Sequence, residues 1–424
     1  MKSPWPTKKL GEICEEIISG DWGTEREKTG SVLCKVIRGT DFILAQKGKL
    51  SEFPDRYIDI EKFEKIKLKQ GDILVEISGG SKDQPTGRIL FWDRNETIPI
   101  AFSNFVKKIL LNTGIVEPKF FFRYWQFLYF KGITKNYEDR TTNIRNFKLK
   151  EFLENEEIPL PPLPIQQKIV KILDTIQEAI DIYDKIIEKT KELKKSLMGD
   201  LFNYGAPSFR RGRKLKKTEI GELPEDWGVV RIKNVVLDTE QKDPSKTPLQ
   251  EIKYIDVSSI SNEFLKIVEY KSYLGKDAPS RARKILKEND IIFATVRPYL
   301  KRIAFVPKEY DGFYGSTAFC VLRSNPEKIL PYFLFYYVST DVFVSKVSGY
   351  QTGSGYPAIT DDQVKNELIP LPPLPEQQEI AEILQTIDQK IEIEKRKKEL
   401  YGELFKTMLN KIINQEVEVE NFEV

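Results

Sequence analysis

Several stretches of the chain combine basic side chains with amides and hydroxyls, which is the chemistry of nucleic-acid contact. Four of them, GGSKDQPTGR, DRTTNIRNFK, SRARK and TVRPYLKR, begin at Gly79, Asp139, Ser280 and Thr295. A fifth, GYQTGSGYPAIT from Gly349, adds an amide and several hydroxyls in a predicted loop. Arginine pairs with guanine edges and phosphates, and amide side chains pair with adenine. An ordinary solvated loop is the alternative interpretation of each stretch.

The candidate DNA contacts are the basic residues of these stretches and one amide. A further basic run, RRGRKLKK from Arg210, fits a phosphate contact and a linker equally well. The candidates are Arg88, Arg140, Arg145 and Lys148 in the first half of the chain, and Arg281, Arg297, Lys301, Arg302 and Gln351 in the second half.

The residue types also exclude several kinds of catalysis. The chain contains no histidine, which removes Ser-His-Asp and Cys-His catalysis and His-ligated metals. It has no phosphate-binding loop, no dinucleotide turn, and no Asn-Pro-Pro-aromatic tetrapeptide of the kind that amino-methyltransferases use. The nearest approach to a metal-dependent nuclease is Asp243 followed by Glu251 and Lys253, a spacing that so charged a chain produces by accident. We therefore expect a binding protein that uses neither a cofactor nor a metal.

Length and composition set the frame for these residues. The chain has 424 residues, of which 40% are hydrophobic, and a net charge of +3. Two or three domains with real cores are expected, with basic patches rather than a polycation. The three cysteines lie far apart and form no CxxC pair, as in a reduced cytoplasmic protein. The N-terminus lacks an apolar signal core, and Pro331 and Asp341 interrupt the most apolar stretch, so no membrane association is expected.

One proline-rich decapeptide occurs twice in the chain. IPLPPLPIQQ begins at Ile158 and IPLPPLPEQQ begins at Ile369, and a run of several turns without proline or glycine follows each copy. Each run therefore predicts a long helix. The prolines stiffen the chain and cannot enter a helix interior, so they fix each helix onto its globular domain. A ligand for SH3-type domains is the alternative interpretation of PPLP.

Apolar residues recur at heptad spacing along both predicted helices, which is typical of a coiled coil. Two matched stripes in one chain favour pairing of the helices with each other over separate packing of each helix on its own domain. The centre of the second helix, EKRKKE, is polar. The predicted pairing residues are Ile169, Ile172, Ile176, Ile186 and Leu193 in the first helix, and Ile380, Ile383, Ile387, Tyr401, Leu404 and Met408 in the second.

A segment of about 150 residues, the size of one domain, precedes each helix. The two segments are weakly alike: GDILVEISGG from Gly71 parallels NDIIFATVRPY from Asn289, and each segment contains an aromatic helix opened by proline. β-branched runs mixed with a few helices predict an α+β (mixed α/β) fold, built twice by internal duplication. The expected order is domain 1 at 1–157, the first helix at 158–204, a linker at 205–222, domain 2 at 223–368 and the second helix at 369–424.

Throughout its length the chain resembles the specificity subunit of a type I restriction–modification enzyme. The segment TEIGELPEDW from Thr218 and the two decapeptides are typical spellings of that family, and SPWPTKKLGEI from Ser3 is a looser copy of the first. The resemblance implies two target-recognition domains, each reading one half of a split, asymmetric target in double-stranded DNA. It also implies two long antiparallel helices that separate the domains and set the spacer between the half-sites.

The resemblance further implies partners and a non-catalytic role. Two methyltransferase subunits would dock on the helices and carry S-adenosylmethionine and the adenine chemistry, and restriction subunits would be further partners. Two alternatives remain open at this point. One is a metal-dependent DNA endonuclease that uses Asp243, Glu251 and Lys253; the other is a scaffold that joins partners without contacting DNA.

Overall fold

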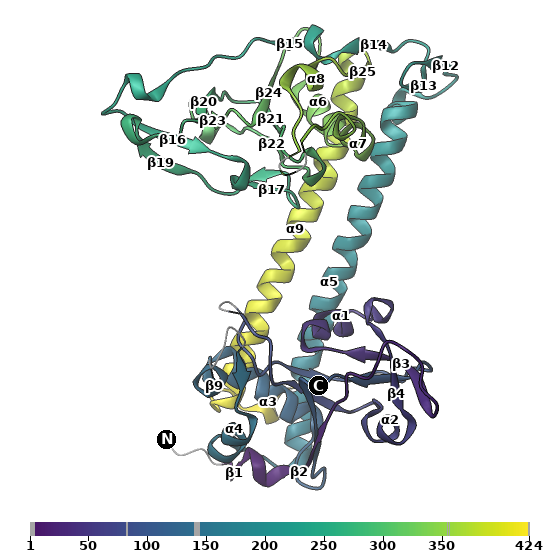
Figure 1. Ribbon diagram of the computed structural model, residues 1–424, viewed down its shortest axis with the longest axis vertical. Helices are drawn as coiled ribbons and strands as arrows, with labels where there is room; N and C mark the ends of the chain where they lie inside the picture. Colours follow the sequence, from purple (N-terminus) through teal and green to yellow (C-terminus); the bar gives the residue numbers. More distant parts are fainter. Residues whose placement is uncertain (1–4, 82–83, 140–144, 354, 356, 423–424) are drawn as a thin grey trace. The chain divides into compact units, whose positions relative to one another are not determined.

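The structure, a computed structural model, describes residues 5–81, 84–139, 145–353, 355 and 357–422 (Figure 1). The chain divides into two units. Unit 1 comprises Met1–Asp184 together with Arg396–Val424, and unit 2 comprises Lys185–Lys395. The two long helices each contribute one part to unit 1 and the other part to unit 2, so that each unit holds a segment of both.

The two largest sheets of unit 1 form most of its globular part. The larger is antiparallel with the order β2-β8-β5-β6, and the smaller has the order β4-β3-β7, in which β3 and β7 run parallel. Buried positions along β5 are continuous, which suits a central strand with both faces covered. The strands are β1 (Thr7–Lys9), β2 (Cys14–Ser19), β3 (Ser31–Ile37), β4 (Asp55–Asp59), β5 (Ile73–Glu76), β6 (Ile89–Phe91), β7 (Ile100–Phe102), β8 (Val106–Leu111), β9 (Glu138–Asp139), β10 (Asn146–Phe147) and β11 (Glu157–Pro159), and the short helices are α1 (Phe42–Gln46), α2 (Ile60–Ile66), α3 (Pro118–Phe130) and α4 (Leu149–Asn155).

Unit 2 repeats this plan. The order β24-β21-β22 is antiparallel as β8-β5-β6 is, and β16 and β23 run parallel as β3 and β7 do, which confirms the predicted duplication of an α+β fold. The strands are β12 (Leu215–Thr218), β13 (Gly221–Pro224), β14 (Gly228–Arg231), β15 (Val236–Leu237), β16 (Glu251–Ile255), β17 (Ile260–Ser261), β18 (Lys266–Ile267), β19 (Lys271–Leu274), β20 (Ala282–Ile285), β21 (Ile291–Ala294), β22 (Ile303–Phe305), β23 (Tyr314–Ser316), β24 (Phe319–Ser324) and β25 (Leu368–Leu371), and the short helices are α6 (Pro331–Val338), α7 (Asp341–Ser348) and α8 (Asp361–Lys365).

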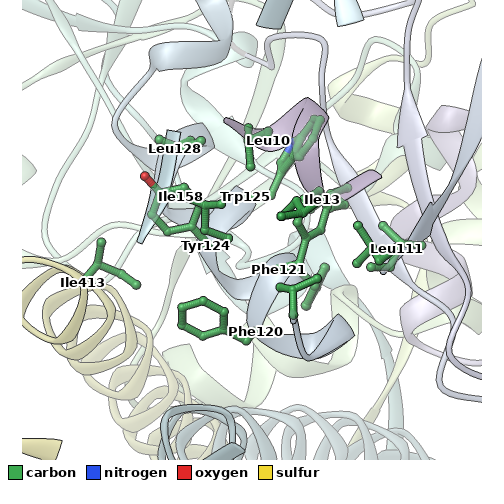
Figure 2. Close-up of a cluster of buried hydrophobic side chains, with 14 of the residues drawn as sticks. Leu10, Ile13, Leu111, Phe120, Phe121, Tyr124, Trp125, Leu128, Ile158 and Ile413 are labelled. Carbon is green, nitrogen blue, oxygen red and sulfur yellow. The ribbon is translucent and has the colours of Figure 1, made fainter. Parts of the chain in front are cut away.

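An aromatic helix organises the core of unit 1. Proline begins α3, where its missing N–H costs nothing, and the Glu117 side chain caps the same turn by accepting a hydrogen bond from the Phe120 N–H. Figure 2 shows Phe120, Phe121 and Trp125 of α3 pointing into a cluster of apolar side chains. The Trp125 indole N–H donates to the Gly87 carbonyl at 2.8 Å, so its polar atom is satisfied inside the core. In unit 2, α6 begins at Pro331 in the same way.

The long helices are α5 (Leu163–Tyr204) and α9 (Leu374–Ile413). They run antiparallel within unit 1, because Asp184 of α5 pairs with Lys398 of α9 at 2.6 Å while the rings of Tyr183 and Tyr401 lie 5.4 Å apart. In unit 2, Lys194 of α5 pairs with Asp388 of α9 at 2.6 Å.

Most of the predicted pairing residues are buried in, or pack against, the apolar clusters of the two units, and each cluster contains residues of both long helices. In unit 1, Ile169 and Ile172 are buried in the core cluster, and Ile176 and Met408 pack against it. In unit 2, Ile380 is buried, and Ile383 and Ile387 pack against its cluster. Ile186 is half-buried.

Two predicted pairing residues differ: Leu193 is 53% exposed and Leu404 is 43% exposed. The physical reason is the helix period. A straight helix of 3.6 residues per turn rotates by about 20° per heptad away from a strict seven-residue repeat. Three heptads separate Ile172 from Leu193, so the heptad position turns outward. On α9 the neighbouring Phe405 is buried in place of Leu404.

A buried glutamine explains the repeated decapeptide. The Gln166 side chain accepts a hydrogen bond from the Glu117 N–H at 2.8 Å and donates to the carbonyls of Ile115 at 3.0 Å and Pro161 at 2.8 Å. These contacts join the start of α5 to the start of α3 and to the proline segment. The amide is fully used inside the protein, where an unsatisfied polar group would be costly.

Unit 2 repeats these contacts through Gln377. Its side chain accepts from the Leu330 N–H at 2.8 Å and donates to the carbonyls of Lys328 at 3.1 Å and Pro372 at 2.9 Å. The two glutamines thus fasten each long helix to the aromatic helix of its own unit. The strand pairs β1–β11 and β14–β25 hold the residues on the other side of the prolines.

The two decapeptides differ at one residue, Ile165 in the first and Glu376 in the second. Ile165 packs against the apolar cluster of unit 1. Glu376 is fully buried and accepts hydrogen bonds from the Trp227 indole at 2.8 Å and the Ala206 N–H at 3.0 Å. Its carboxylate also pairs with the Arg213 guanidinium at 2.5 Å.

This carboxylate gives structure to the segment that the sequence leaves as a linker. Residues 205–222 contain a one-turn helix, Pro207–Phe209, and the first part of the hairpin β12–β13. Arg213 joins the segment to Glu376 and to Asp226, and these pairs raise the pKa of the guanidinium, chiefly through the hydrogen bond to Glu376. Arg213, one residue of the basic run from Arg210, thus forms its ion pairs within the protein.

The Glu376→Gln variant tests this clamp. It should lower the free energy of unfolding by about 2–3 kcal/mol, because the buried carboxylate loses its charge and Arg213 keeps only the exposed Asp226 as a charge partner. Urea denaturation followed by circular dichroism measures the change. Glu382→Gln, at an exposed position of the same helix, is the matched control and should change stability by less than about 0.5 kcal/mol. Equal effects of the two variants would contradict the clamp.

Candidate nucleic-acid interface

The predicted basic stretches of unit 1 meet each other. The chain that leaves β5 lies beside the chain that enters α4, through a bridge between Ser78 and Asn146. The Gly79 N–H donates to the Arg145 carbonyl at 3.1 Å, and the Phe147 N–H donates to the Ile77 carbonyl at 2.8 Å. Backbone hydrogen bonds therefore bring together two loops whose contacting residues lie 66 to 70 positions apart in the sequence.

Unit 2 builds the same loop pair at the same place. A bridge joins Val296, which follows β21, to Ala358, which precedes α8. The Arg297 N–H donates to the Pro357 carbonyl at 2.8 Å, and the Ile359 N–H donates to the Thr295 carbonyl at 2.9 Å. We call the two pairs the loop pair of unit 1 (Ile77–Arg88 with Arg145–Lys148) and the loop pair of unit 2 (Thr295–Arg302 with Gly349–Gln351 and Pro357–Thr360).

Two candidate arginines of unit 1 are held by buried carboxylates. Arg88 forms two hydrogen bonds to Glu76, at 2.7 and 2.5 Å, and the Glu76 side chain is fully buried. Gly39 lies against this carboxylate, since a Cβ there would come within 2.5 Å of Oε1. Arg145 pairs with Glu138 at 3.1 Å, and Glu138 also accepts from the Thr86 N–H at 2.7 Å. These two ion pairs hold the backbone of the loops in place.

The remaining candidates of unit 1 differ in what surrounds them. Lys148 forms a surface ion pair with Glu151 at 3.5 Å, and exposed pairs of this kind contribute little to stability. Its side chain is therefore available for other contacts. Arg140 lies outside the described residues.

The candidates of unit 2 fall into the same two groups. Arg302 donates to the carbonyls of Val257 and Ile260, both at 2.9 Å, and so braces a neighbouring turn. Gln351 donates to the Ser348 carbonyl at 2.6 Å. Arg281 is exposed, and among the described residues no carboxylate forms an ion pair with it.

One carboxylate that the sequence does not single out holds Lys301. Asp341, at the start of α7, pairs with both Lys301 and Lys195. Hydrogen bonds from Lys195 and Lys301 lower the pKa of Asp341 to about 2, so the carboxylate is charged at neutral pH. Two lysines share one carboxylate here, which leaves a net positive charge beside the loop pair of unit 2.

The nuclease spacing gains no support from the described residues. Asp243 hydrogen-bonds to Ser245 and lies 3.4 Å from Arg283, and Glu251 is exposed on β16. Lys253 lies over aromatic rings instead of beside these carboxylates. Within the described ranges no cluster of acidic or cysteine side chains has the arrangement of a metal site. The three cysteines are free thiols.

No helix in the described part of the chain combines the length and the apolar character that a membrane span needs. Most of the basic and amide candidates lie on the two loop pairs defined above.

Comparisons with known proteins agree with these features. The model of the type I restriction modification DNA specificity domain matches residues 2–192 and 224–400. The type I restriction enzyme MjaVIII specificity subunit of Methanocaldococcus jannaschii is 34% identical over 290 residues, which are 64% of this chain and 64% of that subunit. A second protein of that organism, described as the MjaX specificity subunit of a type I restriction enzyme, is 27% identical over 428 residues, 98% of this chain and 94% of its own length.

A solved structure shares the whole fold. The S subunit of a type I restriction–modification system from M. genitalium aligns with a TM-score of 0.54 over 97% of this chain and 96% of that chain, at 13% identity. At that identity the likeness concerns the fold alone.

Arg88→Ala and Arg281→Ala should separate structural from exposed arginines. Removing Arg88 leaves the Glu76 carboxylate buried without its partner, so the free energy of unfolding should fall by about 3 kcal/mol. Removing the exposed Arg281 should change it by less than about 0.5 kcal/mol. Urea denaturation of both variants gives the comparison. A stable Arg88→Ala protein would show that the Glu76 pair does not support the loop.

Proposed function

The chain belongs to the family of type I restriction–modification DNA specificity domains, and on this premise we propose that it is the non-catalytic DNA-reading subunit of a type I restriction–modification enzyme. Each unit reads one half of a bipartite, asymmetric target in double-stranded DNA. The observation that carries this proposal is the loop pair, which is built twice with the same backbone contacts and different side chains. Gly79 occupies the place of Arg297, and Arg145 occupies the place of Pro357. Two copies of one scaffold with different loops suit two different half-sites.

The proposed DNA contacts comprise two exposed candidates and three half-buried candidates on the loop pair of unit 2. Lys148 in unit 1 and Arg281 in unit 2 suit phosphate contacts, because neither supports the fold through a buried partner. Arg297, Lys301 and Gln351 lie on the loop pair of unit 2, where base edges are the expected contacts. Arg140 belongs to the same proposal by its place in the sequence.

Arg88, Arg145 and Arg302 take a second role in this proposal. Each is engaged by carboxylates or carbonyls of its own unit, and so each supports the shape of a loop. Their guanidinium groups are still proposed to contact DNA. Replacing one of these arginines would therefore lower both the affinity for DNA and the stability of the protein.

The proposed partners are two methyltransferase subunits, with restriction subunits as a further layer. Exposed apolar residues on the long helices support a docking role: Leu193 and Ile393 in unit 2, and Leu400 and Leu404 in unit 1, are each more than 40% exposed. A partner that covered these side chains of the long helices would remove their apolar area from water. The duplication supplies one such surface in each unit, which suits two copies of a partner. The methyl donor and the adenine chemistry then reside in the partner, and this chain needs no cofactor.

Exchange of one domain tests the division of the target. The full-length chain is co-expressed with its methyltransferase partner, and methylated sites are selected from a random DNA library. A chimera in which the residues before Ile158 come from a relative should change only one half of the selected site. A change in both halves would mean that the units read the target jointly, and the absence of any selected sequence would overturn the DNA-reading function.

Lengthening the helix pair tests whether it sets the spacer. Seven residues inserted after Thr190 of α5 and seven after Glu392 of α9, at the same level of the pair in unit 2, add about 10 Å of helix and keep the heptads in phase. With about 3.4 Å per base pair, the spacer between half-sites should grow by about three base pairs while both half-sites keep their sequence. An insertion in α5 alone is the control and should impair folding. An unchanged spacer in the double insertion would show that the helices do not set the distance.

A further inference from the structure

One turn in the loop pair of unit 2 has an unusual backbone. Arg297 and Lys301 both adopt left-handed conformations, with φ of 49° and 51°, on either side of the one-turn helix Pro298–Leu300. Side chains disfavour this region because Cβ crowds the following carbonyl, and it is usually left to glycine. Two such residues four positions apart mark a turn whose side chains are retained in spite of the backbone cost.

Unit 1 shows what the backbone alone requires at this place. Gly79 makes the same hydrogen bond as Arg297 and also has a positive φ, of 115°. The scaffold therefore needs a positive φ here, and glycine meets the need without strain. Unit 2 places an arginine there instead. The Arg297 guanidinium donates to the Gly355 carbonyl at 3.4 Å and is half-buried, so this side chain lies along the neighbouring loop with part of its surface open to solvent.

Backbone hydrogen bonds and packing hold both ends of the turn. The Leu300 N–H donates to the Arg297 carbonyl at 2.9 Å, and the Lys301 N–H donates to the Pro298 carbonyl at 2.9 Å. Pro298 is buried, and helix α7 packs against the turn. The pairing of Lys301 with Asp341 fixes the end of the turn to the start of that helix.

Tyr299 lies at the tip of this turn and is 51% exposed. A large aromatic side chain is thus held in water on a rigid support, between Arg297 and Lys301. The second lysine on Asp341, Lys195, adds positive charge nearby. An exposed ring between cations matches a nucleic acid, whose bases offer flat faces and whose phosphates flank them.

We propose that Tyr299 inserts at a base step of double-stranded DNA and stacks on a base of the half-site read by unit 2, while Arg297 and Lys301 contact the flanking phosphates. The proposal rests on the DNA-reading function above. The stretch ISGGSKDQPTGR, which leads from Ile77 to Arg88, contains no aromatic residue, and Phe147 on the other segment of the pair is buried in the core. Among its described residues, the loop pair of unit 1 therefore offers no equivalent exposed ring. The two units then read DNA by different means, unit 1 without and unit 2 with a stacking side chain.

This contact has a consequence for the target. Insertion of a ring separates neighbouring base pairs, and pyrimidine–purine steps unstack most easily. One flexible step of this kind is therefore expected in the half-site of unit 2. The preference would come from deformability of the DNA, without a hydrogen bond from Tyr299 to a base edge.

The test compares Tyr299→Ala, Tyr299→Phe and Tyr204→Ala in the full-length chain co-expressed with its methyltransferase partner. Tyr204, at the end of α5, is an exposed tyrosine of unit 2 outside the turn, with 47% exposure. On the selected target duplex, Tyr299→Ala should raise the dissociation constant about tenfold and relax the preference at one step of the unit 2 half-site. Tyr299→Phe, which keeps the ring, and Tyr204→Ala should remain within about twofold of the unaltered chain.

A second measurement needs no variant. 2-Aminopurine is placed at successive positions of each half-site other than the methylated adenine, which the partner takes out of the stack. Its fluorescence should rise at one step of the unit 2 half-site when the unaltered chain binds, and stay low at all tested positions of the unit 1 half-site. Binding of Tyr299→Ala within twofold, with an unchanged selected sequence and no 2-aminopurine signal, would overturn the inference while leaving the DNA-reading function intact. Failure of the unaltered chain to select any sequence would overturn both.

Discussion

The fold of each unit depends on one buried glutamine side chain at the start of a long helix. Gln166 and Gln377 each use the amide oxygen to hold the first turn of an aromatic helix and the amide nitrogen to hold two carbonyls. One of those carbonyls belongs to the proline segment, which cannot form a helical hydrogen bond of its own. A glutamine has one acceptor and two donor hydrogens, and all of them are used in this geometry. No other side chain supplies that set at that length, which accounts for the exact recurrence of the residue.

Apart from this glutamine, the two units share their backbone contacts but differ in the side chains of their loops. Asp72 pairs with Lys108 in unit 1, and Asp290 pairs with Arg323 in unit 2, so the turn before the central strand is held by an ion pair in both. The loops that follow the central strand share their backbone contacts but not their side chains. Structural contacts are therefore concentrated in the strands and helix starts, where a change would disturb the core. Loop residues that make no structural contact can change, and with them the DNA sequence that the unit would bind.

Much of this frame could be predicted from the sequence because it follows local rules. Proline at a first helical turn, the repeated decapeptide and the proline-free runs lead to the helix starts and to the duplication without any knowledge of contacts. The same holds for the place of the loops, which follow a strand in each copy. The outcome at Leu193 and Leu404 was beyond such rules, since a seven-residue pattern does not show how far a real helix of 3.6 residues per turn rotates away from its partner.

The roles of the arginines required the folded chain. Arg88 and Arg281 are both basic residues in short loops, and only the structure shows that the first faces Glu76 across 12 residues of chain. A carboxylate that becomes buried looks in sequence like any other surface charge. Glu138 was missed for that reason. Asp341 is exposed and was missed because its two ion pairs join residues that lie far apart in the sequence. Tyr299 was missed because an aromatic residue in a loop usually packs inward. The left-handed backbone at Arg297 has no sequence signal except the glycine at the matching place in unit 1.

The single difference between the two decapeptides bears on how genes for such proteins can exchange parts. Glu376 depends on Arg213 and Trp227, which lie upstream of the second domain or at its first residues. A crossover that imports the domain but keeps its flanks preserves Arg213 and Glu376, and needs only a tryptophan from the donor. A crossover inside the domain takes Arg213 and Trp227 from one parent and Glu376 from the other. The buried contacts then form only when both parents have these residues. The chemistry of one carboxylate thus defines where the coding sequence tolerates recombination, and it makes the two halves of the gene unequal as donors for each other.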